Sequence, residues 1–549
     1  MARCDRARPG QDGRVEADGF ALLGVALGAL VLAGTVFARR TGIPEPVVLL
    51  AVGLAASALP SSTAIELPPD LVFLVFLPPL LFRASFLTSP RTLRENATPL
   101  ALLSVGLVLA TAFGVAAVVT VVVPGLGFAE GLVLGAVVAP TDPVAAAAVF
   151  RRLGAPRRVT DLVEGESLIN DATALVLLAI AIEVVIDGPP TPGAALRELV
   201  VTIVGGIAFG VVVARAVMAL RGRLSEDVGI QLLLSLLVPF VAYVPADAVH
   251  ASGVLAVVTT GVLLGGGTDG AFSAATRLPA MAFWSLLDLI LNAFLFVLLG
   301  LQVRQILEQI PDLTTGQLAV SGLAVVLVVA GLRLAWQFVI PPALYWLRRR
   351  AGRPAGRSSA GERLLIGWTG MRGAVSLAAA LSIPLQGNDG PFPGRPLILF
   401  LTVAVVLASL LIQGITLPYV LTRTGLAGGE DTTEEEREAR LALADVALTR
   451  LTELERDGSL PHGASEPLRQ LWEHTRARID PDENPDHDLT EARLAVTVAQ
   501  RAELARRRED GSLPPEVARA LREELDLQQV RLDSETPGGR PGLGRSGHA

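Results

Sequence analysis

Long apolar segments separated by short polar connections occupy most of the chain. Most of these segments hold about 20 residues, the length that an α-helix needs to cross the hydrocarbon core of a bilayer. The pattern predicts an all-α, polytopic membrane domain over residues 19–422. This domain contains about thirteen spans, at 19–38, 43–59, 69–88, 97–123, 127–151, 160–186, 195–221, 228–245, 249–267, 277–301, 316–346, 362–385 and 397–421.

The two ends of the chain are polar and are predicted to lie in water. Residues 1–18 form an N-terminal arm. Residues 423–534 form a helical cytoplasmic tail, in which two helix-forming stretches each end at the turn signal Asp-Gly-Ser-Leu-Pro, at 457–461 and 510–514. The tail is either a plain helical hairpin or a module that regulates the protein or supports a dimer. Residues 535–549, rich in Gly, Pro and Arg, are expected to be disordered.

Charge is distributed unevenly along the chain. The sequence has arginine but no lysine, its net charge is −7, and its tail is acidic, which argues against nucleic-acid binding. By the positive-inside rule the connections with clustered arginines face the cytoplasm, so we expect the N-terminus outside the cell membrane and the tail inside. These connections carry Arg39, Arg40, Arg91, Arg94, Arg151, Arg152, Arg157, Arg158, Arg221, Arg223, Arg277, Arg348, Arg349, Arg350, Arg353, Arg357 and Arg363. The single cysteine, Cys4, allows neither an intrachain disulfide nor a cysteine metal site.

Acidic side chains interrupt the apolar pattern within the fifth and sixth spans. Thr141-Asp142-Pro143 lies inside GLVLGAVVAPTDPVAAAAVF, although a carboxylate at the bilayer centre costs about 2.5–3.5 kcal/mol even on a lenient scale. Pro143 removes a backbone donor and disfavours helix at Asp142, which frees carbonyl oxygens nearby. A simple proline kink with Asp142 paired locally is the alternative. We favour an ion site, because a kink does not need an acid.

The sixth span carries the run EGESLIND at 164–171. Glu166 and Asn170 are four residues apart, as are Ser167 and Asp171, so two adjacent helical rows present carboxylate, amide and hydroxyl oxygens on one face. These oxygens suit a small hard cation, and no soft ligand is among them. A helix cap would explain Ser167 but leaves the acids unexplained. The pattern indicates a site for a cation that crosses the membrane.

Charged residues elsewhere in the spans are candidates for supporting roles. A buried Arg372, within GWTGMRGAVSLAAALSIP, needs a carboxylate partner, and we expect that partner to be Glu166. Arg333, in the eleventh span, is expected to snorkel to the interface or to form a structural pair. Three further residues either line an access funnel or have interfacial and helix-joining roles: Glu164, Asp288 and Asn292.

Four runs, taken together and in this order, resemble the monovalent cation:proton antiporter-1 family, the sodium/proton exchangers. They are FLPPLLFRASF at 76–86, the Thr141-Asp142-Pro143 run, EGESLINDATALV at 164–176 and MRGAVSLAAALSIP at 371–384. The resemblance covers residues 20–420 and implies a thirteen-helix inverted-repeat fold. Its fifth and twelfth spans would be crossed, broken helices, with Asp142 and Arg372 near the partial charges of their ends. It also implies a homodimer, with a dimerisation domain and a moving core domain.

The resemblance assigns a role to the polar groups of these runs. It implies that the carboxylate of Asp171 binds either the cation or a proton. It also implies that Glu166 acts through water and through its pair with Arg372. The Na⁺ ligands that it implies are Asp171, Asp142, Ser167 and the backbone carbonyl of Thr141.

Stoichiometry and access depend on three further positions. Asn170 stands beside Asp171, and in the family this pair, rather than two adjacent aspartates, goes with electroneutral one-for-one exchange. Arg83 and Ser85 depart from the family, whose members often carry acidic or small residues there. This departure bears on whether the third span lines an access funnel, and it does not affect the prediction of the ion site.

The residues also suggest a mechanism by themselves. A low dielectric favours the protonated form of a carboxyl group, and an arriving cation expels that proton, so the two ions compete for one site. Alternating access of this site gives coupled exchange. We therefore expect a Na⁺/H⁺ antiporter of the cell membrane, surrounded by membrane lipid, that is not an enzyme and needs no cofactor beyond the transported ions. A K⁺/H⁺ antiporter, a cation channel and an intramembrane aspartyl protease are the alternatives.

Overall fold

The computed structural model describes the chain in two units, residues Met1–Gly429 and Glu430–Ala549, each of which is treated by itself. The residues it describes are 12–41, 43–58, 68–189, 191–221, 223, 227–266, 274–351, 358–388, 390–428, 430–458, 465–479 and short stretches between 496 and 528. Some predictions lie outside these residues. They concern most of the N-terminal arm with Cys4, the turn signal at 510–514 and the segment 535–549.

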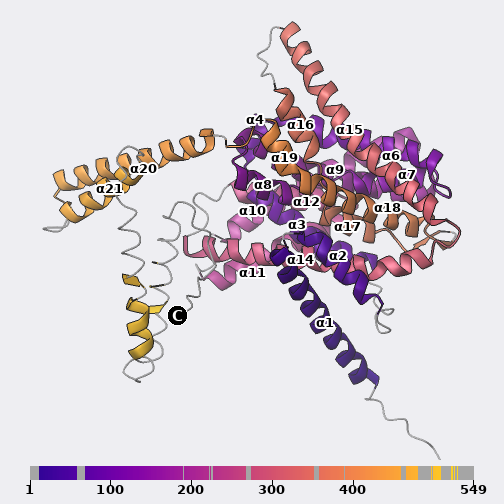
Figure 1. The fold of residues 1–549 in the computed structure, drawn as a ribbon, viewed down its shortest axis with the longest axis horizontal. Coiled ribbons are helices and arrows are strands. Elements are labelled where there is room, and N and C mark those ends of the chain that lie inside the picture. The colour runs from indigo at the N-terminus through magenta and orange to yellow at the C-terminus, as the bar shows by residue number, and fades with distance from the viewer. Residues whose placement is uncertain are drawn as a thin grey trace, which may run out of the picture. The chain divides into compact units, whose positions relative to one another are not determined.

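The first unit is a bundle of helices, as predicted (Figure 1). Among the described residues, one two-stranded hairpin, β1 (Gln386–Gly387) with β2 (Gly390–Pro391), is the exception to the all-helical fold. The helices are α1 (Asp12–Thr41), α2 (Glu45–Ala56), α3 (Pro69–Leu87), α4 (Pro90–Glu95), α5 (Ala97–Ala101), η2 (Leu102–Leu107), α6 (Val108–Val122), α7 (Phe128–Val138), α8 (Val144–Leu153), α9 (Arg157–Asp187), α10 (Pro192–Arg221), α11 (Val228–Ala248), α12 (Gly253–Gly266), α14 (Ala274–Glu308), α15 (Thr315–Arg350), α16 (Ala360–Trp368), α17 (Ala374–Leu381), α18 (Arg395–Ala408), η3 (Ser409–Gln413) and α19 (Gly414–Arg423).

Seven helical segments of the described chain are long and apolar enough to cross a membrane. They are Ala97–Val122, Arg157–Asp187, Arg197–Arg221, Val228–Ala248, Thr276–Glu308, Thr315–Arg350 and Arg395–Arg423. Four shorter apolar helices accompany them, at Glu45–Ala56, Leu71–Leu87, Phe128–Val138 and Gly253–Gly266. The polytopic all-α class is therefore confirmed, whereas the exact number of thirteen spans stays a prediction.

Two of the spans are broken in the middle. One consists of α7 and α8 with an irregular stretch at 139–143, and the other of α16 and α17 with an irregular stretch at 369–373. Pro143 explains the first break, because proline lacks the backbone donor that a continuous helix needs. The breaks meet, since the backbone N–H of Asp142 donates to the carbonyl of Met371 at 2.7 Å. The expectation of two broken helices that cross is thus met.

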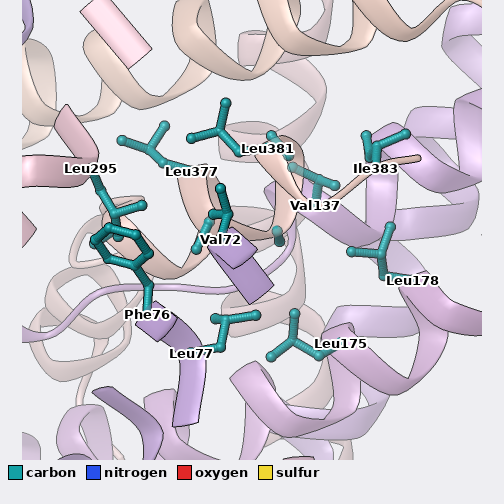
Figure 2. Close-up of a cluster of buried hydrophobic side chains, with 14 of the residues drawn as sticks. Val72, Phe76, Leu77, Val137, Leu175, Leu178, Leu295, Leu377, Leu381 and Ile383 are labelled. Carbon is teal, nitrogen blue, oxygen red and sulfur yellow. The ribbon is translucent and has the colours of Figure 1, made fainter. Parts of the chain in front are cut away.

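An apolar core lies against the half-helices α7 and α17 (Figure 2). α3, α7, α9, α14 and α17, which are far apart in the sequence, bring their side chains together there. The short half-helices α7 and α17 are therefore held by packing against their neighbours, which compensates for their length. The labelled members of this core, all less than a tenth exposed, are Val72, Phe76, Leu77, Val137, Leu175, Leu178, Leu295, Leu377, Leu381 and Ile383.

Close backbone contact fixes the neighbouring helices. α2 meets α14 where Gly53 faces Gly300, and a Cβ built on Gly53 would lie 3.0 Å from the Cα of Gly300. Small residues of this kind allow helix backbones to approach closely inside a membrane.

The second unit holds α20 (Glu430–Arg456) and α21 (Ser465–Ile479). Ion pairs join these two helices: Arg469 contacts Glu455 at 2.6 Å, and Arg476 contacts Asp445 at 2.8 Å. Because the later residue of α21 meets the earlier residue of α20, the two helices run antiparallel.

Candidate functional site

The polar groups of the sixth predicted span lie buried in the middle of α9. Glu166, Ser167, Asn170 and Asp171 are each 6% exposed or less. Because α9 is continuous through this run, the spacing of four residues places them on adjacent rows, as the sequence predicts. The helix thus carries two carboxylates, a hydroxyl and an amide into the protein interior.

Two hydrogen bonds attach α9 to the break between α7 and α8. The hydroxyl of Ser167 donates to the Thr141 carbonyl at 2.6 Å, and the amide of Asn170 donates to the Thr141 hydroxyl at 2.8 Å. The irregular backbone at this depth is therefore paired with side chains of α9. Asn170 acts here as a donor, a role that an ionised aspartate cannot fill.

Asp142 lies in the break, directly before α8. Its Oδ1 accepts a hydrogen bond from the backbone N–H of Val144 at 2.9 Å, so the carboxylate sits at the partially positive N-terminal end of α8. Gly373 of the other break comes close to it: a Cβ built there would lie 2.5 Å from the Cβ of Asp142 and nearer still to its carboxylate. Only a residue without a side chain fits at position 373.

Asp171 differs in its hydrogen bonding from Glu166, the other carboxylate that α9 buries, because both oxygens of Glu166 accept from Arg333. Its Oδ1 is buried and has no hydrogen-bond partner among the described residues. A buried oxygen in this condition carries a desolvation penalty that a bound cation or proton can relieve.

A cavity of about 430 Å³ connects these groups with the start of α9. Thr141, Asp142, Ser167 and Asp171 all line it, and so do Arg157 and Asp161. Since a helix rises about 1.5 Å per residue, the cavity follows α9 for roughly 20 Å between residues 157 and 171. Arg157 is 68% exposed, so the cavity leads from the surface to the buried carboxylates.

The three funnel candidates line this same cavity. Glu164 lies 4.0 Å from Arg151. Asp288 forms an ion pair with Arg83, and its backbone carbonyl accepts from the amide of Asn292 at 2.7 Å. The structure thus brings Glu164, Asp288 and Asn292 together with the ion-site candidates, and their role as a funnel stays a prediction.

The expected pair between Glu166 and Arg372 is wrong. Glu166 pairs with Arg333 of α15, at 2.5 Å from Oε1 to Nη1 and 2.9 Å from Oε2 to Nη2. Both side chains are at most 3% exposed, and Arg333 also donates to the Ile366 carbonyl at 3.2 Å. This fork-to-fork geometry is the strong form of an ion pair. Of the two interpretations of Arg333, a structural ion pair fits, and snorkelling to the membrane interface does not, because its side chain is buried against Glu166.

Arg372 has a different environment. Its Nε donates to the Val138 carbonyl at the end of α7 at 2.9 Å, and its Nη1 donates to the Gly370 carbonyl just after α16. Its backbone N–H donates to the hydroxyl of Ser409 in η3 at 3.1 Å. The guanidinium therefore binds one carbonyl at the end of α7, where the helix dipole places negative partial charge, and one carbonyl in the break after α16.

The described residues contain no group of three His, Cys, Asp or Glu side chains that could hold a resident metal. The oxygens at the inner end of the cavity have the hard character that suits an alkali cation as transported cargo. They belong to two carboxylates, a hydroxyl and a backbone carbonyl. Fold and site together define a membrane transporter for cations built on broken helices.

Comparison with known proteins identifies the family. The family model described as sodium/hydrogen exchanger, transmembrane, matches residues 27–423, and the chain belongs to this family. An uncharacterized Na⁺/H⁺ exchanger of Mycobacterium tuberculosis is 34% identical over 521 residues, which is 92% of this chain and 95% of that one. The Na⁺/H⁺ antiporter ApNhaP of Aphanothece halophytica is 31% identical over 415 residues, 74% of each chain.

A solved structure supports the fold. The sodium proton antiporter MjNhaP1 from Methanocaldococcus jannaschii at pH 8 matches with a TM-score of 0.59 and 20% identity, over 74% of this chain and 99% of that one. The predicted family and the predicted class, a cation:proton antiporter, are confirmed. The family consists of transporters rather than enzymes. Its description names sodium, so the alternative of a K⁺/H⁺ antiporter is not favoured.

Proposed function

We propose that this chain exchanges Na⁺ for H⁺ across the cell membrane, one for one, by alternating access. The observation that carries the proposal is the buried, unpartnered Oδ1 of Asp171 at the inner end of a cavity that Asp142 also lines. A single carboxylate of this kind can hold a proton or a cation, but not both. Competition for it couples the two fluxes in opposite directions.

The Na⁺ shell that we propose consists of Asp171, Asp142, Ser167 and the backbone carbonyl of Thr141. Its support is that the first three side chains line one cavity and that Ser167 is bonded to the Thr141 carbonyl. Asn170 holds the Thr141 side chain, so it positions the break while contributing no charge. With Asp171 as the exchanging carboxylate, one Na⁺ replaces one proton, which makes the cycle electroneutral.

Arg333 and Arg372 have separate supporting roles in this proposal. Arg333 neutralises Glu166, so this buried carboxylate is kept from binding a second cation. Arg372 binds the Val138 carbonyl at the end of α7 and the Gly370 carbonyl in the other break, which would otherwise form a competing cation site at the crossing. The net negative charge available to Na⁺ is then confined to Asp142 and Asp171.

We infer that the cavity faces the cytoplasm. Arg151 and Arg157, which line it, belong to the arginine-rich connections that the positive-inside rule places there. This orientation puts the N-terminus outside and the tail inside. Labelling of the variant Asp161→Cys, with Cys4→Ser as background, by a membrane-impermeant maleimide tests it. Labelling only in inside-out vesicles supports the assignment, and labelling only in right-side-out vesicles contradicts it.

We also propose a homodimer, on the strength of the family resemblance. The mass of the detergent-solubilised protein, measured by light scattering with correction for bound detergent, tests this directly. A mass of one chain at all concentrations would rule the dimer out.

Flux measurements on reconstituted protein test the transport function. Proteoliposomes with an imposed pH gradient are given Na⁺, Li⁺ or K⁺, and the recovery of a pH-sensitive dye reports exchange. Asp171→Asn should abolish cation-dependent recovery because an amide neither exchanges a proton here nor balances the cation charge. The matched control is Asp161→Asn, which removes a carboxylate from the outer part of the same cavity and should retain most of the flux. Wild-type flux in the Asp171 variant would refute the assignment.

A further inference from the structure

A second cavity, of about 930 Å³, adjoins the ion cavity. It lies among the end of α3, helix α4, the end of α12 and the start of α14, with Ser235 of α11 at its wall. Nothing in the proposed exchange cycle uses it. Its lining combines an arginine-rich rim with an apolar wall, and each of these two parts restricts what can occupy it.

The rim carries a surplus of positive charge. Four arginines, Arg83, Arg91, Arg94 and Arg277, line the cavity together with one acidic residue, Glu95, and Arg83 also pairs with Asp288 outside it. Glu95 pairs with Arg91 at 2.7 Å, and both side chains are more than half exposed. A rim of this composition complements an anion, and guanidinium groups bind phosphate through several hydrogen bonds at once.

The wall is apolar and aromatic. Phe82 stacks on Phe86 with ring centroids 5.8 Å apart and contacts Trp284 at 5.3 Å. Leu87 and Met281 are 60% and 56% exposed, although both lie on apolar, membrane-embedded helices. Leu87 also lines the ion cavity, whereas Met281 lines only the second cavity of the two, where an exposed apolar side chain suits contact with hydrocarbon. A soluble anion would use the rim and leave the wall empty.

We propose that this cavity binds an anionic phospholipid of the cytoplasmic leaflet. The phosphate lies at the arginine rim, and the acyl chains lie along Phe86, Leu87, Met281 and Trp284. Phosphatidylglycerol is a suitable probe, because it has a net negative charge and a small headgroup. The combination of charge complementarity and an apolar wall selects a lipid over a soluble phosphate.

The lipid cavity and the ion cavity share a wall. Arg83, Leu87, Thr88 and Ser89 line both. Arg83 pairs with Asp288, which lines only the ion cavity of the two. A lipid phosphate beside Arg83 competes with Asp288 for the guanidinium and leaves more negative charge facing the ion path. Lipid occupancy therefore lowers the apparent KM for Na⁺, by about twofold for one carboxylate acting through a water-filled cavity. This regulatory part rests on the proposed exchange function, whereas lipid binding does not.

Binding is measured on the full-length protein in detergent, as the shift in thermal unfolding midpoint on addition of dioleoylphosphatidylglycerol. We expect a saturable upward shift, and none with dioleoylphosphatidylcholine at equal concentration. The double variant Arg91→Gln, Arg94→Gln should need about tenfold more lipid for half-maximal shift, because each lost charge-assisted bond weakens binding. Glu95→Gln should need less lipid than the wild type, since it removes the competing carboxylate.

The matched control removes two exposed arginines from another connection, with Arg349→Gln, Arg350→Gln. This variant should respond to the lipid as the wild type does. Equal impairment of the two double variants would show unspecific attraction and overturn the proposal. An equal shift with soluble glycerol phosphate would indicate a soluble anion and overturn it as well.

Transport kinetics test the regulatory part separately. In proteoliposomes, adding phosphatidylglycerol to a phosphatidylcholine bilayer should lower the apparent KM for Na⁺ in the wild type and in the Arg349, Arg350 control. The Arg91, Arg94 variant should show a smaller decrease, because it experiences the same surface potential but lacks the lipid site. An equal response in all three proteins would assign the effect to surface potential alone and refute the link through Arg83.

Discussion

Replacing Arg333 by methionine tests the buried ion pair that this residue forms with Glu166. The variant keeps an unbranched apolar side chain in place of the stem but leaves Glu166 without its bidentate partner. Removing one member of a buried ion pair destabilises a protein by about 3–5 kcal/mol, because the remaining charge is left uncompensated. Both side chains are at most 3% exposed, so water cannot take the place of the guanidinium.

A double-mutant cycle isolates the pair itself. Glu166→Gln added to Arg333→Met removes the stranded charge, so the double variant should recover part of the lost stability. We expect a coupling free energy of about 2–3 kcal/mol between the two positions. The measurement is unfolding in mixed micelles, followed by tryptophan fluorescence, with the four proteins of the cycle compared under one condition.

The matched cycle uses Arg372 in place of Arg333. Arg372→Met should also destabilise the protein, because the carbonyls of Val138 and Gly370 lose their donor. Its coupling with Glu166→Gln should nevertheless stay below about 0.5 kcal/mol, as for sites without a shared contact. A larger coupling of Glu166 to Arg372 than to Arg333 would refute the Arg333–Glu166 pair and restore the partner expected from the sequence.

The geometry of the breaks and the site allows three further tests. Gly373→Ala should reduce flux at least about tenfold, because the Cβ of the new alanine collides with Asp142. The control Gly331→Ala, at a position with open space around it, should transport normally. Equal effects of the two substitutions would contradict the close approach of Gly373 to Asp142. Asn170→Asp should replace the amide that donates to Thr141 by a carboxylate next to Asp171, so flux should become sensitive to a potassium diffusion potential; continued insensitivity would count against the charge argument. In the wild type the apparent KM for Na⁺ should rise as pH falls, at unchanged maximal rate, because protons and Na⁺ compete for one carboxylate. A fall in maximal rate alone would argue against a site that the two ions share.

Much of the fold could be predicted because it depends on local signals. A span of apolar residues is visible in the sequence, and Pro143 marks the break between α7 and α8. The small hairpin β1–β2 and the π-helical turns η2 and η3 could not be anticipated. They depend on how neighbouring helices fit against one another, and such fits leave no period in the sequence.

The site could be predicted in part for the same reason. Helical spacing places Ser167 and Asp171 on one face of α9, and this follows from the sequence alone. The partner of Glu166 does not follow from it, because Arg333 and Arg372 give the same local signal, an arginine within an apolar span. Only the placement of α15 and of the break between α16 and α17 decides which guanidinium reaches the carboxylate.

The contact between the two breaks joins main chain to main chain, from the N–H of Asp142 to the carbonyl of Met371. Neither group belongs to a side chain, so the bond itself needs no particular side chain at either position, although proline at 142 would remove its donor. The main chain of Asp142 therefore holds the crossing, while its side chain lines the ion cavity. In evolutionary terms, a substitution at position 142 can alter the ion site without removing the bond that joins the two breaks.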